Sequence, residues 1–284
     1  MPKLIQISDT HLSPVQGFFY ENFRVATAAI NAAQPDAVVN TGDMSINGPK
    51  NEDDLAFARW CHDWIEAPLY TLPGNHDVGE EPGGESLKQM VNEERLERFY
   101  RYFTACRFHF DLGNWRLVGL NSQIFNTGLP HEEEQWAWLD GALDHDGPIG
   151  IFQHKPMFAR TPDEEPLPRI SVSPAVHDRL EGFYREAGVR FIGSGHIHLH
   201  RKVEYDDVAH IWCPSTAFHP SNLPEQFDGS LGYVEYNFDG DDFTAELVTP
   251  EGLHHRSLAD VKENGRYKYL KDVPTTSVEV DWPR

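Results

Sequence analysis

Short apolar runs rich in β-branched residues recur along the chain and alternate with longer segments that carry apolar residues at helical spacing. Each run has the length and composition of a buried strand. Alternation of this kind predicts a largely parallel sheet covered by helices. The predicted strands are 4–7, 37–39, 69–72, 149–152 and 189–192, and the predicted helices are 20–34, 51–66, 131–143 and 174–187.

Two further pairs of runs indicate antiparallel hairpins. The runs 107–111 and 116–120 flank the turn residues Gly113-Asn114, and the runs 233–238 and 243–248 flank Gly240-Asp241. Parallel strands combined with hairpins predict a mixed α/β (α+β) fold, with two sheets face to face and helices outside.

The chain length bounds the number of domains. With 284 residues and 39% hydrophobic content, the chain can build one large core. We therefore predict a single domain over residues 1–257. The polar segment 258–284 is predicted to be an arm that packs on this core or contacts another subunit.

Polar side chains follow each of the five predicted strands. Because the carboxyl ends of parallel strands share one edge of a sheet, we expect these side chains to lie close together. Side chains two residues apart in extended backbone also point the same way. The pair Asp9 and His11 and the pair His196 and His198 should therefore each converge on one point. The residues are Asp9 and His11, Asp43, Asn75 with His76 and Asp77, His154, and His196 with His198.

Carboxylate, amide and imidazole groups together suit first-row metals such as Fe, Mn, Zn or Co, and the lack of nearby cysteine argues against a structural zinc site. Each motif alone has an ordinary explanation. Asp43 and Asn75 follow glycines and could be turn residues, and His154 could be a hydrogen-bonded structural residue. The coincidence of all five at strand ends favours a metal centre.

Charge and cysteine content restrict the partners and the compartment. The formal net charge is −21, which opposes binding to nucleic-acid polymers and anionic membranes. Three well-separated cysteines, Cys61, Cys106 and Cys213, are expected to be buried reduced thiols. The first residues lack the features of a signal peptide. Together these features predict a cytoplasmic protein.

The motifs Asp9-x-His11, Gly42-Asp43, Gly74-Asn75-His76-Asp77, His154 and Gly195-His196-x-His198 resemble those of the calcineurin-like metallophosphoesterase superfamily. The resemblance covers roughly residues 4–216 and is specific, because five motifs occur in order. Its overall character is closest to the class III cyclic-nucleotide phosphodiesterase and glycerophosphodiesterase group. The resemblance implies a four-layered αββα sandwich.

The resemblance also implies a role for each residue. It implies two transition metals per chain, whose identity among Fe, Mn, Zn and Co stays open, and attack on phosphorus by a water or hydroxide that bridges them. His76 would stabilise the pentacoordinate state or protonate the leaving oxygen. Asp43 would bridge both metals, with Asp9, His11 and His198 on the first and Asn75, His154 and His196 on the second.

Local departures separate this chain from other branches. Protein serine/threonine phosphatases carry an Asp-Arg-Gly run after the bridging aspartate, and purple acid phosphatases carry a ligand tyrosine at the position of Ile46. Many members of the nearest group have Asp or Asn at that position, which can orient the catalytic histidine, and Asn47 is a candidate replacement. Candidate residues of a substrate wall are His219, Asn121, Arg160 and Phe158.

The predicted function is binuclear-metal hydrolysis of small phosphodiesters, such as a cyclic nucleotide or a glycerophosphodiester. Phosphomonoesterase or nucleotide-diphosphate-linkage hydrolase activity is the alternative, and a non-catalytic scaffold is a remote one because the whole motif set is retained. The net charge disfavours a nuclease. The expected partner is a small phosphate ester, and a homodimer remains open.

Overall fold

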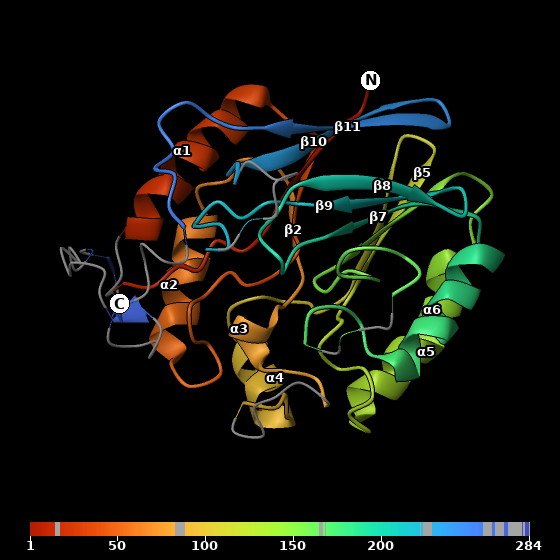
Figure 1. Ribbon diagram of the computed structural model, residues 1–284, viewed down its shortest axis with the longest axis horizontal. Helices are drawn as coiled ribbons and strands as arrows, with labels where there is room; N and C mark the ends of the chain where they lie inside the picture. Colours follow the sequence, from red (N-terminus) through yellow and green to blue (C-terminus); the bar gives the residue numbers. More distant parts are fainter. Residues whose placement is uncertain are drawn as a thin grey trace.

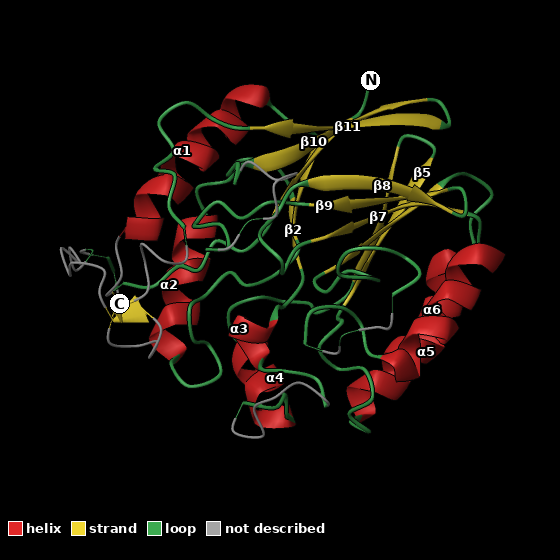
Figure 2. Cartoon of the chain, viewed as in Figure 1, coloured by secondary structure: helices red, strands yellow, loops and turns green. Residues whose placement is uncertain are grey.

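The computed structural model describes residues 1–14, 18–82, 89–164, 167, 169–221, 223, 229–257, 263–264, 270–271, 280 and 282–283. Most of the segment predicted as a C-terminal arm, 258–284, therefore lies outside the described residues. Figure 1 follows the chain from its N-terminus, and Figure 2 separates its helices from its strands.

Two β-sheets form the centre of the fold. The five-stranded sheet has the order β11-β10-β1-β2-β3, and the six-stranded sheet has the order β4-β5-β6-β7-β9-β8. The first contains β1 (Lys3–Ile7), β2 (Ala37–Asn40), β3 (Leu69–Thr71), β10 (Tyr233–Asp239) and β11 (Asp242–Val248). The second contains β4 (Phe108–Leu112), β5 (Trp115–Leu120), β6 (Ile149–Gln153), β7 (Val189–Ser194), β8 (Arg201–Tyr205) and β9 (Val208–Trp212).

The remaining elements are helices and one short strand pair. The helices are α1 (Phe18–Ala33), α2 (Glu52–His62), α3 (Asn75–Val78), α4 (Glu93–Tyr100), α5 (Pro130–Leu143) and α6 (Pro174–Glu186). The short pair is β12 (Glu263–Asn264) with β13 (Leu270–Lys271). Every strand and helix predicted from the sequence is present, with shifted ends. The elements that were not predicted are α3, α4, β8, β9, β12 and β13.

The prediction that the five motif-bearing strands end at one edge of a single parallel sheet is wrong. These strands are divided between the two sheets. β1, β2 and β3 pair in parallel in the first sheet, and β6 and β7 pair in parallel in the second. After β3 the chain forms the β4–β5 hairpin, and β5 then pairs in parallel with β6. Alternating strands and helices do not specify where one sheet ends and another begins.

Three apolar layers hold the four structural layers together. Along β1, Leu4 faces the layer between the sheets, whereas Ile5 faces the outer layer with α1 and α2, as the period of two requires. In β5, Leu117 faces inward and Val118 faces the layer beneath α5 and α6. Figure 1 accordingly shows α1 and α2 on one side and α5 and α6 on the other. The fold is an αββα sandwich.

A buried glutamine connects the two sheets where β1 and β7 approach their ends. The Gln6 side-chain amide donates to the Ser194 carbonyl at 3.2 Å and to Thr41 Oγ1 at 3.1 Å, and its oxygen accepts from the Tyr236 hydroxyl at 2.7 Å. These bonds satisfy a polar group that would otherwise be costly to bury. They also fix the position of the end of β1 relative to the end of β7.

The described end of the C-terminal segment contacts the same chain. The Val280 backbone N–H donates to the Pro14 carbonyl at 3.1 Å, and the Trp282 ring packs 5.5 Å from that of Phe57. The three cysteines are buried free thiols, as predicted. Within the described residues, no helix combines the length and the apolar character that crossing a membrane requires.

Candidate metal centre

The predicted ligands come together at the strand ends of both sheets. Asp9 and His11 follow β1, Asp43 follows β2, and Asn75 opens α3 after β3. From the second sheet, His154 follows β6, and His196 and His198 follow β7. Among the described residues, three overlapping groups in this region have ligand atoms close enough to hold a metal ion. They are Asp9, His11 and His198, then Asp43, His154 and His196, and a group that links them, His11, Asp43 and His76.

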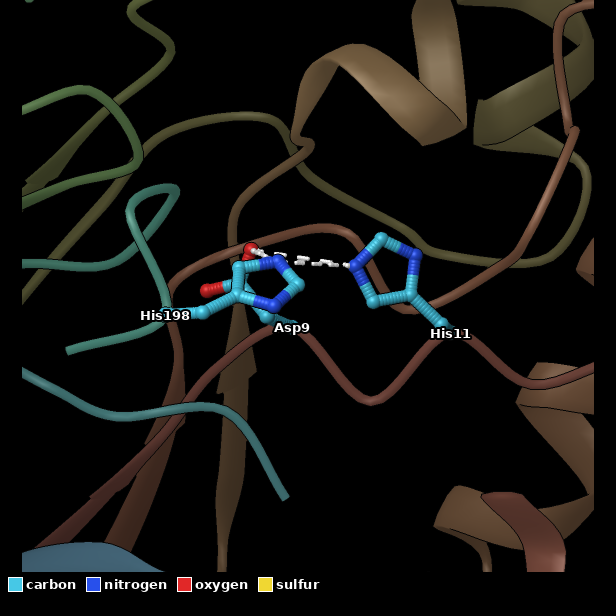
Figure 3. A group of neighbouring side chains, drawn as sticks. All are labelled: Asp9, His11 and His198. Atoms are coloured by element: carbon cyan, nitrogen blue, oxygen red, sulfur yellow. Dashed lines mark hydrogen bonds and ion pairs between the residues drawn. The ribbon is translucent and has the colours of Figure 1, made fainter. Parts of the chain in front are cut away.

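The first group consists of Asp9, His11 and His198, whose side chains converge in Figure 3. The Nε2 atoms of His11 and His198 face each other at 3.1 Å, and His198 Nε2 lies 3.2 Å from Asp9 Oδ1. That carboxylate oxygen is buried and accepts no hydrogen bond from any residue that the structure describes. An unsatisfied buried oxygen beside two imidazole nitrogens fits a cation.

The second group consists of Asp43, His154 and His196, and the side chain of Asn75 lies beside it. His154 Nε2 lies 3.2 Å from Asn75 Oδ1, 3.1 Å from His196 Nδ1 and 3.4 Å from Asp43 Oδ1. The donor set of amide oxygen, two imidazoles and a carboxylate suits a first-row transition metal.

Asp43 lies between the two groups, with one oxygen toward each. Its Oδ1 faces His154, and its Oδ2 lies 3.9 Å from His11 Nε2 in the first group. The backbone N–H of His76 donates to Oδ1 at 2.7 Å and fixes the carboxylate plane. A carboxylate held in this way can serve two cations at once.

Backbone carbonyls fix which nitrogen three of the imidazoles present to the centre. His154 Nδ1 donates to the Thr41 carbonyl at 2.8 Å, and His198 Nδ1 donates to the Phe218 carbonyl at 2.9 Å. His196 is reversed, because its Nε2 donates to the Arg169 carbonyl at 2.8 Å. In each neutral ring the other nitrogen therefore carries the lone pair toward the centre, as metal-ligating histidines require.

The electrostatics of the centre favour a bound cation. Burial opposes ionisation of Asp43, but the neighbouring His154 and His76 outweigh it and hold the pKa of this carboxyl well below its usual range. Burial lowers the pKa of His154, but the carboxylates of Asp43 and Asp9 outweigh it and raise the value to about 9. The centre therefore contains negative charge that attracts a proton or a metal ion.

The reason for the convergence differs from the one predicted. Instead of extended backbone, five of the candidate ligands occupy the left-handed region, which costs a non-glycine residue about 1–2 kcal/mol. Hydrogen bonds from Asp9 N–H to the Gly42 carbonyl and from His11 N–H to the Asp43 carbonyl hold the first loop in place. The φ values are 52° for Asp9, 45° for His11, 53° for Asp43, 71° for His196 and 56° for His198.

Two motif glycines are required by close packing. A Cβ atom at Gly74 would lie 2.1 Å from Asp43 Oδ1, and one at Gly195 would lie 1.9 Å from Ser8 Oγ. Either contact would displace a strand end that carries candidate ligands. The glycines of these motifs therefore allow neighbouring loops to approach each other closely.

The partner of the His76 ring is a backbone group and not the predicted side chain of Asn47. His76 Nδ1 donates to the Ile46 carbonyl at 2.8 Å, whereas the Asn47 side chain accepts from Gln89 Nε2 at 3.4 Å. The side chain at position 46 is therefore not needed to orient the ring. The His76 ring stands edge-on to that of His11, with 4.7 Å between centroids.

The four candidate substrate residues lie in different surroundings. Asn121 is fully buried, and its side-chain oxygen accepts from the Gln123 N–H, while Phe158 is buried against the ring of His210. Arg160 is exposed and pairs with Glu164 at 3.2 Å. His219 is half-buried and donates from Nδ1 to the Pro220 carbonyl. Their substrate-binding roles stay predictions.

Asp77 has a connecting role that the sequence did not reveal. Its carboxylate accepts from the N–H groups of Gly74, Met44 and Ser45 at 2.9, 3.2 and 2.8 Å, and also from Ser45 Oγ at 2.8 Å. These bonds tie the loop after β2 to the loop after β3. The position of Asp77 beside Asn75 and His76 in the motif was the available signal.

The substitution Asp77→Asn should lower the free energy of unfolding by at least about 2 kcal/mol, since its NH2 group would face N–H donors that then lose their acceptor. Urea unfolding measured in the presence of a chelator tests this expectation. Asp178→Asn, whose parent side chain is 96% exposed, is the matched control and should leave stability unchanged. Equal stability of both variants would contradict the connecting role.

Comparison with known proteins agrees with this geometry. Residues 2–200 match the family model described as calcineurin-like phosphoesterase. The chain is 27% identical over 218 residues to the human protein "Serine/threonine-protein phosphatase CPPED1", covering 72% of this chain and 61% of that protein, which is less than two thirds of its length. It is 26% identical over 208 residues to "Probable glycerophosphodiester phosphodiesterase GpdQ" of Arcobacter nitrofigilis, covering 69% and 71%.

A solved structure supports the fold. A dimetal phosphatase from Danio rerio superposes with a TM-score of 0.60 at 13% identity, covering 87% of this chain and 95% of that one. The family generally binds two metal ions, and the described residues provide candidate ligand groups for them. The match over residues 2–200 shows that the chain belongs to the calcineurin-like phosphoesterase family of hydrolases.

Proposed function

We propose that this chain hydrolyses small phosphodiesters, such as cyclic nucleotides or glycerophosphodiesters, at a centre of two metal ions. The observation that carries the proposal is the position of Asp43, whose two carboxylate oxygens face different ligand groups. One metal would be held by Asp9, His11, His198 and Asp43, and the other by Asn75, His154, His196 and Asp43.

The bound metals would supply two functions, activation of water and neutralisation of charge on the phosphoryl oxygens. The protein supplies orientation. The Ile46 carbonyl holds His76 Nδ1 at 2.8 Å, so Nε2 is the atom proposed to contact the phosphoryl group or to give a proton to the leaving oxygen. Asp43 orients the same residue through its backbone N–H.

The charge beside the centre supports a diester. Lys155 directly follows the candidate ligand His154, but its ammonium is buried and lies 2.9 Å from Glu81 and 3.6 Å from Glu80. This lysine therefore presents no net positive charge to a substrate. A diester carries one negative charge and needs less compensation than a dianionic monoester.

Phosphomonoester hydrolysis, or cleavage of a nucleotide-diphosphate linkage, is the second candidate. It is supported by the similarity to CPPED1, which is named as a serine/threonine-protein phosphatase. The metals are proposed to be Fe, Mn, Zn or Co, and the partner a small phosphate ester. The net charge of −21 opposes nucleic-acid polymers and anionic membranes as partners. We also propose that the protein is cytoplasmic and forms a homodimer.

Purified protein should contain about two transition metals per chain and should hydrolyse bis(p-nitrophenyl) phosphate faster than p-nitrophenyl phosphate. Chelation should abolish both activities, and Mn²⁺ or Co²⁺ should restore them, because metals activate the water. Elemental analysis and parallel rate measurements test this. A faster monoester rate would favour the second candidate, and a fully metallated protein inert toward both would contradict hydrolysis.

Replacing Asp43 with Ala should reduce the metal content below two per chain and abolish turnover, because both metals would lose a shared ligand. Metal analysis after reconstitution and dialysis measures the first effect. Asp140→Ala is the matched control, because this exposed aspartate lies on α5, away from the candidate ligand groups. Wild-type metal content and turnover in Asp43→Ala would refute the bridging assignment.

Replacing His76 with Ala should leave the metal content at the wild-type level and slow diester hydrolysis by about 10²–10⁴-fold, the usual contribution of a general acid or base. Elemental analysis and kcat measured on the same preparation separate these two effects. Loss of metal in His76→Ala would instead make His76 a ligand, in line with its proximity to His11 and Asp43.

A further inference from the structure

A buried cluster of charged side chains lies directly behind the candidate ligand Asn75. It consists of Lys155, Glu80 and Glu81, and both Lys155 and Glu81 are fully shielded from solvent. The Lys155 ammonium donates to Glu81 Oε1 at 2.9 Å and lies 3.6 Å from Glu80 Oε2. The metal ligation proposed above uses none of these three groups.

Burial of such a cluster requires a reason. An ionised lysine is costly to remove from water unless carboxylates compensate it, and replacing such pairs by apolar residues is often neutral or stabilising. The cluster is therefore weak evidence for stability and calls for another role.

The contact between Glu80 and Asn75 indicates that role. Asn75 Nδ2 donates to Glu80 Oε1 at 2.8 Å, while Asn75 Oδ1 lies 3.2 Å from His154 Nε2 in the second ligand group. An amide has two ends of nearly equal shape, and only its oxygen can bind a metal. A carboxylate accepts hydrogen bonds but does not donate them, so Glu80 selects the orientation in which the oxygen faces the centre.

The backbone of Glu80 is held on both sides. Its N–H donates to the Gln89 carbonyl at 2.8 Å, and its carbonyl accepts from the Val91 N–H at 2.9 Å. Lys155 is equally fixed, because its N–H donates to Ser122 Oγ at 3.1 Å and its carbonyl accepts from Gln153 Nε2 at 2.6 Å. Both ends of the Glu80–Lys155 contact are therefore anchored to the fold.

We infer that Glu80, itself held by Lys155, is a positioning residue that fixes the amide of Asn75 for metal binding. Because His154 and Lys155 are consecutive, the end of β6 contributes one candidate ligand directly and supports a second through Glu80. This inference rests on the proposed two-metal function. It assigns to the cluster the orientation of one ligand, without contact with the substrate.

The test is titration of the metal-free protein with Co²⁺ alone. The visible absorption of the bound ion reports each binding step. Glu80→Ala should weaken one of the two binding steps by about 10–100-fold, the usual effect of losing an outer-shell partner of a ligand. The other step, assigned to Asp9, His11 and His198, should be unchanged. Glu94→Ala, at a side chain that is 78% exposed, is the matched control and should bind as wild type does.

A double-mutant cycle separates positioning from general loss of structure. If Glu80 acts through Asn75, then adding Glu80→Ala to Asn75→Ala should cause no further loss of Co²⁺ affinity. Additive losses in the two single variants would overturn the inference, as would wild-type binding of two ions by Glu80→Ala. Wild-type protein that binds no metal would instead refute the proposed function.

Lys155→Met provides a second measurement. It removes the cation that holds Glu80 and should weaken the same Co²⁺ step as Glu80→Ala, with the same change in the visible spectrum. Undiminished binding of two ions would overturn the role of Lys155. If this variant fails to fold, the cycle between Glu80 and Asn75 still decides the inference. In that cycle Lys155 is retained and stays paired with Glu81.

Discussion

The apolar layer between the two sheets fixes the relative position of every candidate ligand. Residues such as Leu4 and Val39 from the first sheet meet Phe152 and Phe191 from the second in one continuous core. Interiors of this kind are densely packed and resist sliding. Since three motif-bearing strands belong to one sheet and two to the other, a shift of one sheet against the other would separate the two halves of the candidate metal centre.

Polar groups set the fine register that apolar packing leaves open. Gln6 connects β1 to Ser194 at the end of β7, and Asp77 ties the loop after β2 to the loop after β3. At these strand ends, five buried candidate ligands lie close together: Asp9, Asp43, His11, His154 and His198. Left-handed backbone at five of the candidate ligands is an energetic cost that hydrogen bonds and packing of the loops offset.

The same arrangement relates metal binding to folding. Buried carboxylates and imidazole nitrogens that face one another are unfavourable without a cation, as the orphaned oxygen of Asp9 illustrates. A metal ion that binds the native state but not the unfolded chain therefore stabilises the fold as well as the site. Outer partners such as the Thr41 and Phe218 carbonyls extend this coupling into the surrounding loops.

Much of this protein was predictable from local sequence. Strands were recognisable because β-branched apolar runs are bounded by turn residues, and the hairpin turns carry Gly113 and Gly240 with positive φ. The candidate ligands were recognisable because their residue types suit metals and because each motif follows a predicted strand. The family resemblance added the sandwich, which alternation of strands and helices only permits.

Tertiary structure alone decided the division of the five strands between two sheets, since sheet membership depends on pairing between segments far apart in sequence. It also decided that the Ile46 carbonyl orients His76 and that Glu80 and Lys155 lie behind Asn75. A backbone carbonyl has no sequence signature, and a buried ion pair such as Lys155–Glu81 joins residues 74 positions apart. Residue chemistry and order therefore determined which groups could bind metal, whereas long-range packing determined how they are oriented.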